Sequence, residues 1–403
     1  MTKKSSRRTE SRSLISTIIA AIAVVIAVII STVTGIADLS LLGLGGTATP
    51  APIAGTEVAN VPGNVSVINV GQGFGAQKGF WQVFFTAPTG SSNPRDYVNG
   101  IDTQLATAIN GTQGTLDIAA YEFNNVMLTQ AILNANERGV RVRIVTDDED
   151  GIGDDETTIN QFVDAGIPVV DDGRSALMHD KFMILDSTVV WTGSWNYTIN
   201  DTYRNNNNAL ALRSRQAVAN YQAEFDEMFS GRQFGSRSPS NTPNPSFTQD
   251  GVPIQVYFAA EDDVVSAITS TLDSADTSIR FMTFSFTIEE IGELMLSKAA
   301  SGVLVQGIFE TLGSETSFSR LTPLFCAGLA VRQDGNPFRL HHKVFIVDDD
   351  TVITGSFNIS ANATNSNDEN LLIIQDPALT AQYLAEFERR WAEAVTPTGL
   401  TCR

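Results

Sequence analysis

Two segments of this sequence carry the same set of residues, and that set can do chemistry on a phosphate group. Residues 179–196 read HDKFMILDSTVVWTGSWN, and residues 341–358 read HHKVFIVDDDTVITGSFN. Both follow the pattern His-x-Lys-x4-Asp-x6-Gly-Ser-x-Asn. Because alternate side chains of a strand point to the same side, we expect each histidine beside its lysine. The candidate catalytic residues are His179, Lys181 and Asn196 in the first copy, and His341, Lys343 and Asn358 in the second.

Phosphoryl transfer requires positive charge around the non-bridging oxygens, a nucleophile on one side of phosphorus and a proton donor on the other. Two lysines and two asparagines supply the first. One neutral imidazole attacks phosphorus to form a phosphohistidine, and the other, protonated, donates to the leaving oxygen. The ordinary imidazole pKa of about 6.5 suits both roles. This chemistry needs no metal ion and no cofactor, and the sequence has no ligand cluster of the usual spacing, so we expect neither.

The two motifs lie at equivalent positions of a long internal repeat. The stretch WQVFFTAP at 81–88 pairs with IQVYFAAE at 254–261, and TLDIAAYEFNN at 115–125 pairs with TSIRFMTFSFT at 277–287. Two of the three histidines occupy the repeated motif, and the third, His342, is adjacent. Each copy reads as strand, helix, strand, helix, strand and then a hairpin, which is typical of an α/β layer. We therefore predict two α/β lobes related by a pseudo-twofold axis.

The motif pair resembles that of the phospholipase D superfamily, also called the HKD family, over about residues 79–396. Its form is similar to that of bacterial phospholipase D-like and endonuclease-like members. The resemblance implies mixed sheets flanked by helices, with both motif strands meeting at one shared site. It also implies that His179 is the nucleophile and His341 the general acid.

Several residues around the motifs are expected to support the site. The motif aspartates face away from the phosphate on an alternating strand, so we expect them to bond nearby backbone or turn groups. The motif serines either donate to phosphate oxygens or stabilise the turn. The copies differ 28 positions beyond each histidine, where a carboxylate can stabilise a charged imidazole and an amide can only orient one. The supporting residues are Asp186, Asp348, Ser194 and Ser356, with Asn207 and the catalytic candidate Glu369 at the differing position.

The N-terminal residues predict a membrane segment. Leu14 to Ile30 reads LISTIIAAIAVVIAVII and carries no charge, which is long enough to cross a bilayer. We expect an uncleaved anchor over 14–36 behind a basic cytoplasmic tail (1–13), so that the catalytic body lies outside the cytoplasm. A cleaved signal peptide and a secreted body are the alternative. The remaining predicted parts are a low-complexity tether (37–78), a first lobe (79–230), a linker (231–252) and a second lobe (253–403).

The overall charge and the two cysteines bear on which binding partners and which cross-links the protein can have. The net charge is −19, and the basic residues of the tail make the rest more acidic still. This balance argues against a long nucleic-acid footprint, because phosphate neutralisation supplies most of the affinity of such binders. Cys326 and Cys402 are expected as two unpaired thiols, with Cys326 in the core, and a single disulfide is the alternative. Asn196 and Asn358 also match the glycosylation pattern, and glycans there would block the site, so we expect a source without that modification, most simply a bacterium.

Four functions are compatible with the motifs, because the same chemistry serves many phosphodiesters. The membrane segment and the acidic surface favour hydrolysis of phospholipid headgroups, with transphosphatidylation as a variant. A metal-independent endonuclease is the second candidate. Phosphatidyl transfer of the synthase type and a non-catalytic module that has kept the fold are the remaining two. The expected partners are a phospholipid or other phosphodiester substrate and a membrane.

Overall fold

The computed structural model describes residues 64–402. The predicted cytoplasmic tail, the membrane segment and most of the predicted tether (1–63) lie outside this part. Among the helices of the described residues, none is both long enough and apolar enough to cross a bilayer.

The first lobe is built on a nine-stranded mixed sheet with the order β1-β2-β3-β9-β8-β7-β4-β5-β6. Strands β4, β5 and β6 run parallel to one another, and the other neighbours are antiparallel. The strands are β1 (Ser66–Ile68), β2 (Gly73–Lys78), β3 (Trp81–Thr86), β4 (Thr115–Ala120), β5 (Arg141–Thr146), β6 (Val169–Asp171), β7 (Lys181–Leu185), β8 (Val189–Gly193) and β9 (Asn208–Leu212).

The second lobe repeats this order in an eight-stranded sheet, β10-β11-β17-β16-β15-β12-β13-β14. From β11 onward it matches the first sheet from β3 onward, strand for strand. Its strands are β10 (Ser246–Gln249), β11 (Val252–Ala259), β12 (Ser278–Thr283), β13 (Leu304–Phe309), β14 (Ala330–Gln333), β15 (Lys343–Val347), β16 (Thr351–Gly355) and β17 (Glu369–Gln375). The predicted mixed α/β fold with two sheets flanked by helices is therefore confirmed.

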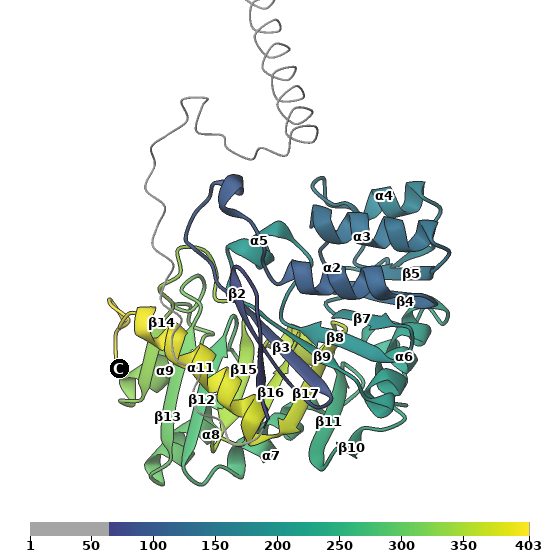
Figure 1. The fold of residues 1–403 in the computed structure, drawn as a ribbon. Helices are drawn as coiled ribbons and strands as arrows, with labels where there is room; N and C mark the ends of the chain where they lie inside the picture. The colour runs from purple at the N-terminus through teal and green to yellow at the C-terminus, as the bar shows by residue number, and fades with distance from the viewer. Residues whose placement is uncertain (1–63, 403) are drawn as a thin grey trace, which may run out of the picture. The chain divides into compact units, whose positions relative to one another are not determined.

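Helices cover both faces of each sheet (Figure 1). The outer face of the first sheet packs against α2 (Asp102–Gly111), α3 (Val126–Glu137) and α4 (Ile159–Asp164), and that of the second against α7 (Val264–Asp273), α8 (Glu289–Ala300) and α9 (Leu321–Cys326). Between the sheets lie α6 (Arg215–Phe229) and α11 (Pro377–Glu393). The short helices α5 (Ile199–Tyr203) and α10 (Ala361–Asn365) follow the two motif hairpins.

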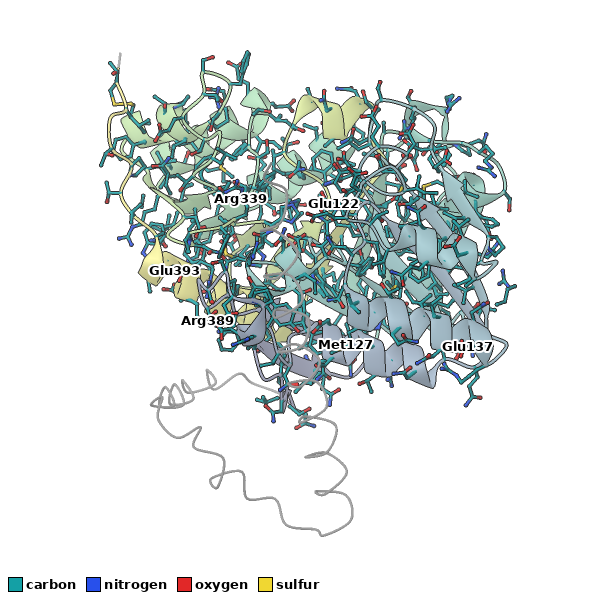
Figure 2. All side chains as sticks on the ribbon, turned by 90° about the horizontal axis from the view of Figure 1, so that it is seen from above. Glu122, Met127, Glu137, Arg339, Arg389 and Glu393 are labelled. Carbon is teal, nitrogen blue, oxygen red and sulfur yellow. A yellow bond between two sulfur atoms is a disulfide. The ribbon has the colours of Figure 1, made fainter. Side chains whose placement is uncertain are left out.

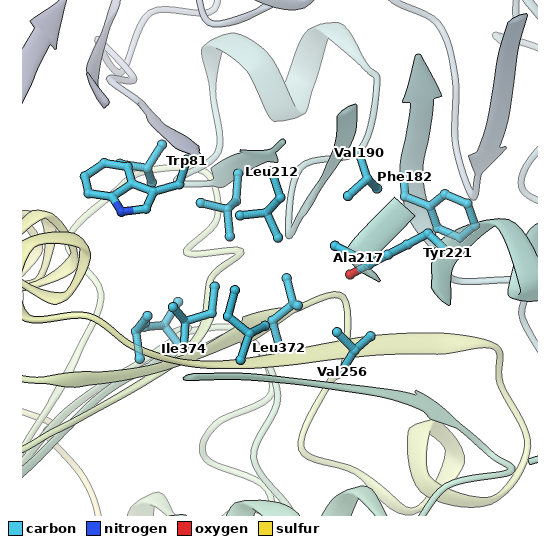
Figure 3. Close-up of a cluster of buried hydrophobic side chains, with 14 of the residues drawn as sticks. Trp81, Phe182, Val190, Leu212, Ala217, Tyr221, Val256, Leu372 and Ile374 are labelled. Carbon is cyan, nitrogen blue, oxygen red and sulfur yellow. The ribbon is translucent and has the colours of Figure 1, made fainter. Parts of the chain in front are cut away.

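The two sheets share one hydrophobic core, which Figure 3 shows at close range. Period-two alternation places Phe182 and Ile184 of β7 in this shared core, while Met183 and Leu185 of the same strand face α2 and α3. Tyr221 of α6 packs on the first sheet and also on Phe258 of the second. Because each lobe completes its core with the other, we infer that they fold as one unit.

Two predicted boundaries are wrong. The first lobe was expected to begin at 79, but β1 and β2 precede that point and pair with the sheet. Likewise the predicted linker 231–252 contains β10, which pairs with β11. Both errors have the same cause: these strands lie at or next to the edge of a sheet, are largely half-exposed or exposed, and include Gly, Ser and Thr, so they lack the apolar alternation that marks a buried strand.

The expectation of two unpaired thiols is also wrong. Cys326, at the end of α9, forms a disulfide with Cys402, and Cys326 is exposed instead of lying in the core. Their Cα atoms are 5.4 Å apart. The two cysteines are 76 positions apart, so no local sequence pattern indicates that they pair. Pairing requires the C-terminal segment to pack close to the end of α9, which only the fold shows.

A large-to-small substitution in the shared core tests whether the two lobes unfold together. Leu372 of β17 is fully buried in that core, so we expect Leu372→Ala to lower the free energy of unfolding by about 2–5 kcal/mol in a single transition. Denaturant unfolding followed by fluorescence and circular dichroism measures this. Leu312→Ala, at a side chain that is 64% exposed, is the matched control and should change stability by under about 0.5 kcal/mol. Two separated transitions in Leu372→Ala would show that the lobes are independent.

Candidate active site

The two motif histidines lie just before the central strands of their sheets. Lys181 opens β7, which runs between β8 and β4, and Lys343 opens β15, which runs between β16 and β12. Both strands are buried throughout because their remaining residues, FMIL and VFIV, are apolar. The rigid core strands thus carry His179 and His341 at their starts.

Backbone hydrogen bonds bring the two histidines to one place from opposite lobes. The His179 amide donates to the Asp368 carbonyl at 3.0 Å, and the His341 amide donates to the Asn206 carbonyl at 2.9 Å. Asp368 immediately precedes β17 of the second lobe, and Asn206 lies just before β9 of the first. Each histidine is therefore fixed to the strand start of the other lobe, and the two positions are reciprocal.

The lysines are buried and bound in the same way in both lobes. Lys181 Nζ donates to the His179 carbonyl at 2.7 Å, and Lys343 Nζ donates to the His341 carbonyl at 2.9 Å. Each ammonium also lies 4.9 Å from an aromatic ring centre, that of Tyr121 or Phe284. Burial lowers the pKa of Lys181 to about 8, and burial together with Lys181 lowers the pKa of Lys343 well below its usual range. The charge of Lys181 acts on Lys343, so the two amines face one region, and in their charged forms both can bind a phosphate anion there.

His179 is oriented by a carboxylate from the opposite lobe. Its Nδ1 lies 2.7 Å from Glu369 Oε2. Ser356 Oγ donates to the same oxygen at 2.8 Å, and Asn367 Nδ2 donates to Oε1 at 3.2 Å. Burial raises the pKa of Glu369 to about 7, although Lys181 opposes the rise. In its ionised form Glu369 accepts all three bonds, which places the ring proton on Nδ1 and leaves Nε2 with a free lone pair. This is the tautomer that a nucleophile needs.

His341 is oriented by an amide from the first lobe. Its Nδ1 lies 3.0 Å from Asn207 Oδ1. The amide cannot be flipped without losing bonds, because its Nδ2 donates to the Asp201 carbonyl at 3.1 Å and Ser194 Oγ donates to its oxygen at 2.9 Å. Asp201 Oδ2 lies 3.4 Å from the same ring nitrogen. A carboxylate therefore accompanies His341 as well, although not at the position equivalent to Glu369.

The motif serines hold these orienting groups. Ser194 Oγ donates to Asn207, and Ser356 Oγ donates to Glu369. Each also accepts from the backbone amide of the following strand, that of Asn208 or Asn370. The sequence left two roles open for these serines, donation to phosphate and support of the turn. The observed contacts differ from both, because each serine bonds the side chain that orients a histidine.

The glycine before each serine is required by close backbone packing. A Cβ added to Gly193 would stand 2.4 Å from the Asn208 carbonyl oxygen, and one added to Gly355 would stand 2.2 Å from that of Asn370. Both glycines also have positive φ values. No other residue fits here without displacing the strand that carries the orienting group.

The motif aspartates lie at the far ends of the motif strands, in the hairpin turns. Asp186 accepts from the backbone amides of Gln113, Gly114 and Thr115, and Asp348 accepts from those of residues 276–278. Both have φ of 49°, which aspartate tolerates in a tight hairpin. The carboxylates tie the hairpin to the strand start beside it and face away from the histidines.

The asparagines differ between the two lobes. Asn196 Nδ2 donates to Glu122 Oε2 at 3.3 Å, and the Asn196 backbone amide donates to Asp201. The side-chain oxygens of Asn196 and Asn358 are both buried and have no hydrogen-bond partner among the described residues. Burial, followed by the charge of Asp201, raises the pKa of Glu122 to about 7. The first lobe therefore places acidic side chains at the site. The second lobe has Ser285 at the position equivalent to Glu122.

Four functional residues escaped the sequence prediction. Asp201 stands 22 positions beyond His179, and its counterpart in the second copy is Ala363. Glu122 follows β4 and had no repeated partner to mark it. Asn208 and Asn370, each 29 positions beyond a motif histidine, accept from the opposite lobe: Asn208 from Thr354 and Tyr383, and Asn370 from Thr192 and Tyr221. Both copies hold an asparagine at this position, so the repeat in the sequence could have identified the pair.

His342 belongs to the scaffold. It is fully buried, with Nε2 3.2 Å from Glu386 Oε1 and Nδ1 3.1 Å from Asn208 Nδ2. The asparagine donates to Nδ1, so the ring proton lies on Nε2 and points to Glu386. The position equivalent to His342 in the first copy is Asp180, whose Oδ1 accepts from Asn370.

Electrostatics prepare the two histidines for a phosphate. Burial, Lys181 and Lys343 lower the pKa of His179 well below its usual value, and burial, the two lysines and His179 do the same to His341. Both rings are therefore neutral in the resting site at neutral pH. A phosphate bound between the lysines would oppose their charges and raise the pKa of His341 again.

A family model described as "Cardiolipin synthase, PLD-like domain" matches the chain twice, at residues 105–229 and 268–391. The mitochondrial cardiolipin hydrolase of Xenopus tropicalis is 36% identical over 132 residues, which are 33% of this chain and 63% of that protein. The match thus spans less than two thirds of the Xenopus protein. The mitochondrial cardiolipin hydrolase of Chlamydomonas reinhardtii is 35% identical over 204 residues, covering 45% of this chain and 91% of that protein.

One solved structure extends the likeness across both lobes. The phosphatidylserine synthase of Haemophilus influenzae Rd KW20 has a TM-score of 0.54 at 13% identity and covers 73% of this chain and 83% of that one. At this identity the likeness shows the fold alone.

Glu369→Gln removes the negative charge beside His179 and keeps the shape of the side chain. We expect it to lower the turnover of bis(4-nitrophenyl) phosphate by about 10- to 100-fold, because the charged imidazole that forms on phosphorylation loses its partner. Glu289→Gln, at an exposed glutamate of α8, makes the same charge change away from the site and should leave turnover unaltered. Equal turnover in Glu369→Gln and Glu289→Gln would contradict the role of Glu369.

The lowered pKa of Lys181 predicts an alkaline limit to activity. The ammonium carries its charge below a pKa of about 8 and loses it above, so kcat/KM should fall as the pH rises through about 8. The same phosphodiester assayed between pH 6 and 10, with circular dichroism to confirm folding at each pH, measures this. A rate that stays constant to about pH 10, near the ordinary lysine value, would show that phosphate binding does not depend on this charge.

Proposed function

We propose a phospholipid substrate for this chain, which belongs to the PLD-like domain family. The proposed activity is that of a phospholipase D-type phosphodiesterase, which hydrolyses the bond between a phospholipid phosphate and its headgroup. The observation that carries the proposal is the exchange of orienting groups across the lobes: Glu369 of the second lobe holds His179 of the first, and Asn207 of the first holds His341 of the second.

In the proposed first step, His179 Nε2 attacks phosphorus. An N–P bond forms, the P–O bond to the headgroup breaks, and the leaving oxygen takes a proton from His341 Nε2. Glu369 stabilises the positive charge that develops on the His179 ring. Lys181 and Lys343 stabilise the charge on the non-bridging oxygens.

In the proposed second step, His341 removes a proton from water and the resulting hydroxide attacks the same phosphorus. The N–P bond breaks, phosphatidic acid leaves, and the His179 lone pair and the His341 proton are restored. A primary alcohol in place of water gives transphosphatidylation by the same route. His179 is assigned as the nucleophile because a full carboxylate holds its Nδ1, whereas His341 has an amide at 3.0 Å and a carboxylate at 3.4 Å.

The acidic groups at the site favour a lipid over a nucleic acid. Glu122 and Asp201 lie in the first lobe close to Lys181, and the Tyr121 hydroxyl donates to Asp150 at 2.6 Å. Glu122 lies near the middle of Figure 2, where the lobes meet. A single phosphodiester can bind despite these carboxylates. A polyanion would bring further phosphates, which the carboxylates and the net charge of −19 would repel. The relatives named as cardiolipin hydrolases also support a glycerophospholipid.

The proposed setting is a membrane, with the catalytic body outside the cytoplasm. The uncharged segment within 14–36 supports an anchor, and the basic residues before it support a cytoplasmic N-terminus. The disulfide between Cys326 and Cys402 supports an oxidising compartment for the body.

Parallel assays test the substrate. We expect the full chain, with millimolar EDTA present, to release headgroups from vesicles of phosphatidylcholine, phosphatidylglycerol or cardiolipin, and to form phosphatidylethanol when ethanol is added. Acid-quenched enzyme should carry the phosphatidyl group on His179 by mass spectrometry, and His179→Asn should carry none.

Single-stranded DNA in the same buffer is the competing substrate. Cleavage of DNA without headgroup release from any vesicle would replace the lipid with a nucleic acid as substrate. Stable binding of vesicles with neither turnover nor a covalent adduct would show a binding module.

A further inference from the structure

Two buried glutamates and one half-buried glutamate meet where the first lobe joins the second. Glu224 and Glu227 lie one turn apart on α6, and Glu261 is the second residue after β11. In Figure 1, α6 lies beside β11, and the two elements are in contact. One carboxylate oxygen from each glutamate lies within 4.8 Å of the others. Glu224 is 3% exposed and Glu227 is 8% exposed.

Within residues 64–402, these carboxylates have no cationic partner. No lysine or arginine of this part of the chain forms an ion pair with any of the three. One oxygen of each lacks a hydrogen-bond donor among the same residues: Glu224 Oε1, Glu227 Oε1 and Glu261 Oε2. Unpaired carboxylates are costly inside a protein unless a cation or shared protons neutralise them, and two of these three are buried.

A fourth side chain, from the segment between the lobes, lies beside this cluster. Ser238 is 8% exposed, and its Oγ has no hydrogen-bond partner among residues 64–402. This hydroxyl stands next to the Glu227 carboxyl. Asn241 of the same segment donates to Glu227 Oε2 at 3.4 Å. The buried, unpartnered hydroxyl can therefore supply a further oxygen beside the carboxylates.

We propose that Glu224, Glu227, Glu261 and Ser238 bind one divalent cation of the calcium type, which ties the two lobes and the segment between them together. Calcium takes about six to eight oxygen ligands at about 2.3–2.6 Å, so two ligands of one ion lie at most about 5 Å apart. The 4.8 Å limit on the three carboxylates meets this requirement. Four protein ligands with hard oxygen atoms exclude a preference for zinc or copper.

The proposed ion is structural and lies outside the phosphate chemistry. None of its ligands bonds to a motif histidine, a motif lysine or their orienting groups. Its ligands come from α6 of the first lobe, from the segment that contains Ser238 and from the turn after β11 of the second lobe. An ion bound to all three segments opposes separation of the lobes, whose contact completes the active site.

Calorimetry and thermal unfolding test the proposal on the full chain. After dialysis against EDTA and then metal-free buffer, titration with CaCl2 should show one site with a Kd of about 10⁻⁵–10⁻³ M. Calcium about 100-fold above that Kd should raise Tm by about 3–5 °C at constant ionic strength. MgCl2 should raise it less, because magnesium holds its water ligands more firmly. At temperatures below the unfolding transitions of both the calcium-bound and the calcium-free chain, kcat should be the same with calcium and with EDTA.

The double substitution Glu224→Gln and Glu227→Gln should abolish both the binding heat and the calcium-dependent rise in Tm. The double substitution Glu137→Gln and Glu289→Gln changes exposed glutamates, one at the end of α3 on the outer edge of the first lobe (Figure 2) and one on α8. It removes the same amount of charge, so it is the charge-matched control and should keep both. The proposal is overturned if the unsubstituted chain binds no calcium, which would mean that shared protons neutralise the cluster. It is also overturned if the double variant binds calcium as the control does, which would move the ion to another acidic group. Loss of calcium binding with normal headgroup release would leave the proposed enzyme intact.

Discussion

The arrangement of this protein depends on an exchange between its two halves. Glu369 of the second lobe holds the His179 ring, and Asn207 of the first lobe holds the His341 ring. The backbone repeats the exchange, because each histidine amide bonds to the strand start of the other lobe. An isolated lobe would therefore lack the group that sets the tautomer of its own histidine. The shared core, with α6 and α11 between the sheets, holds the two halves in the register that this exchange requires.

The two lobes share their strand order and motif contacts but differ in the charge of the groups that orient the histidines. The motif lysines, serines, glycines and aspartates make equivalent contacts in both lobes, as the duplicated strand order demands. The orienting groups do not, since Glu369 faces His179 directly while His341 has Asn207 with Asp201 behind it. A carboxylate in direct contact stabilises a charged ring most. In the proposed mechanism this asymmetry distinguishes the nucleophile from the general acid in a site whose backbone is nearly symmetric.

Much of the fold and part of the candidate site follow from the sequence, for identifiable reasons. The repeat predicts the two sheets, and the spacing of His179, Lys181, His341 and Lys343 predicts which side chains stand together, because both signals are local and occur twice. The register of the repeat also marks Glu369 and Asn207 as a pair. Asp201 and Glu122 could not be found this way, since their positions in the other copy hold Ala363 and Ser285. The disulfide and the buried Glu224 likewise depend on contacts between distant segments, and a glutamate on an amphipathic helix reads as solvated until its partner element is known.

In the proposed mechanism, two imidazoles from opposite lobes serve one phosphorus atom. Vanadate adopts the trigonal geometry of phosphoryl transfer, so a crystal structure of the chain with bound vanadate is the sharpest test of this arrangement. We expect a single vanadium with the Nε2 atoms of His179 and His341 on opposite sides and the ammonium groups of Lys181 and Lys343 on its oxygens. Vanadate held by the histidine of one lobe alone, with the other ring too distant to reach it, would rule out a shared site.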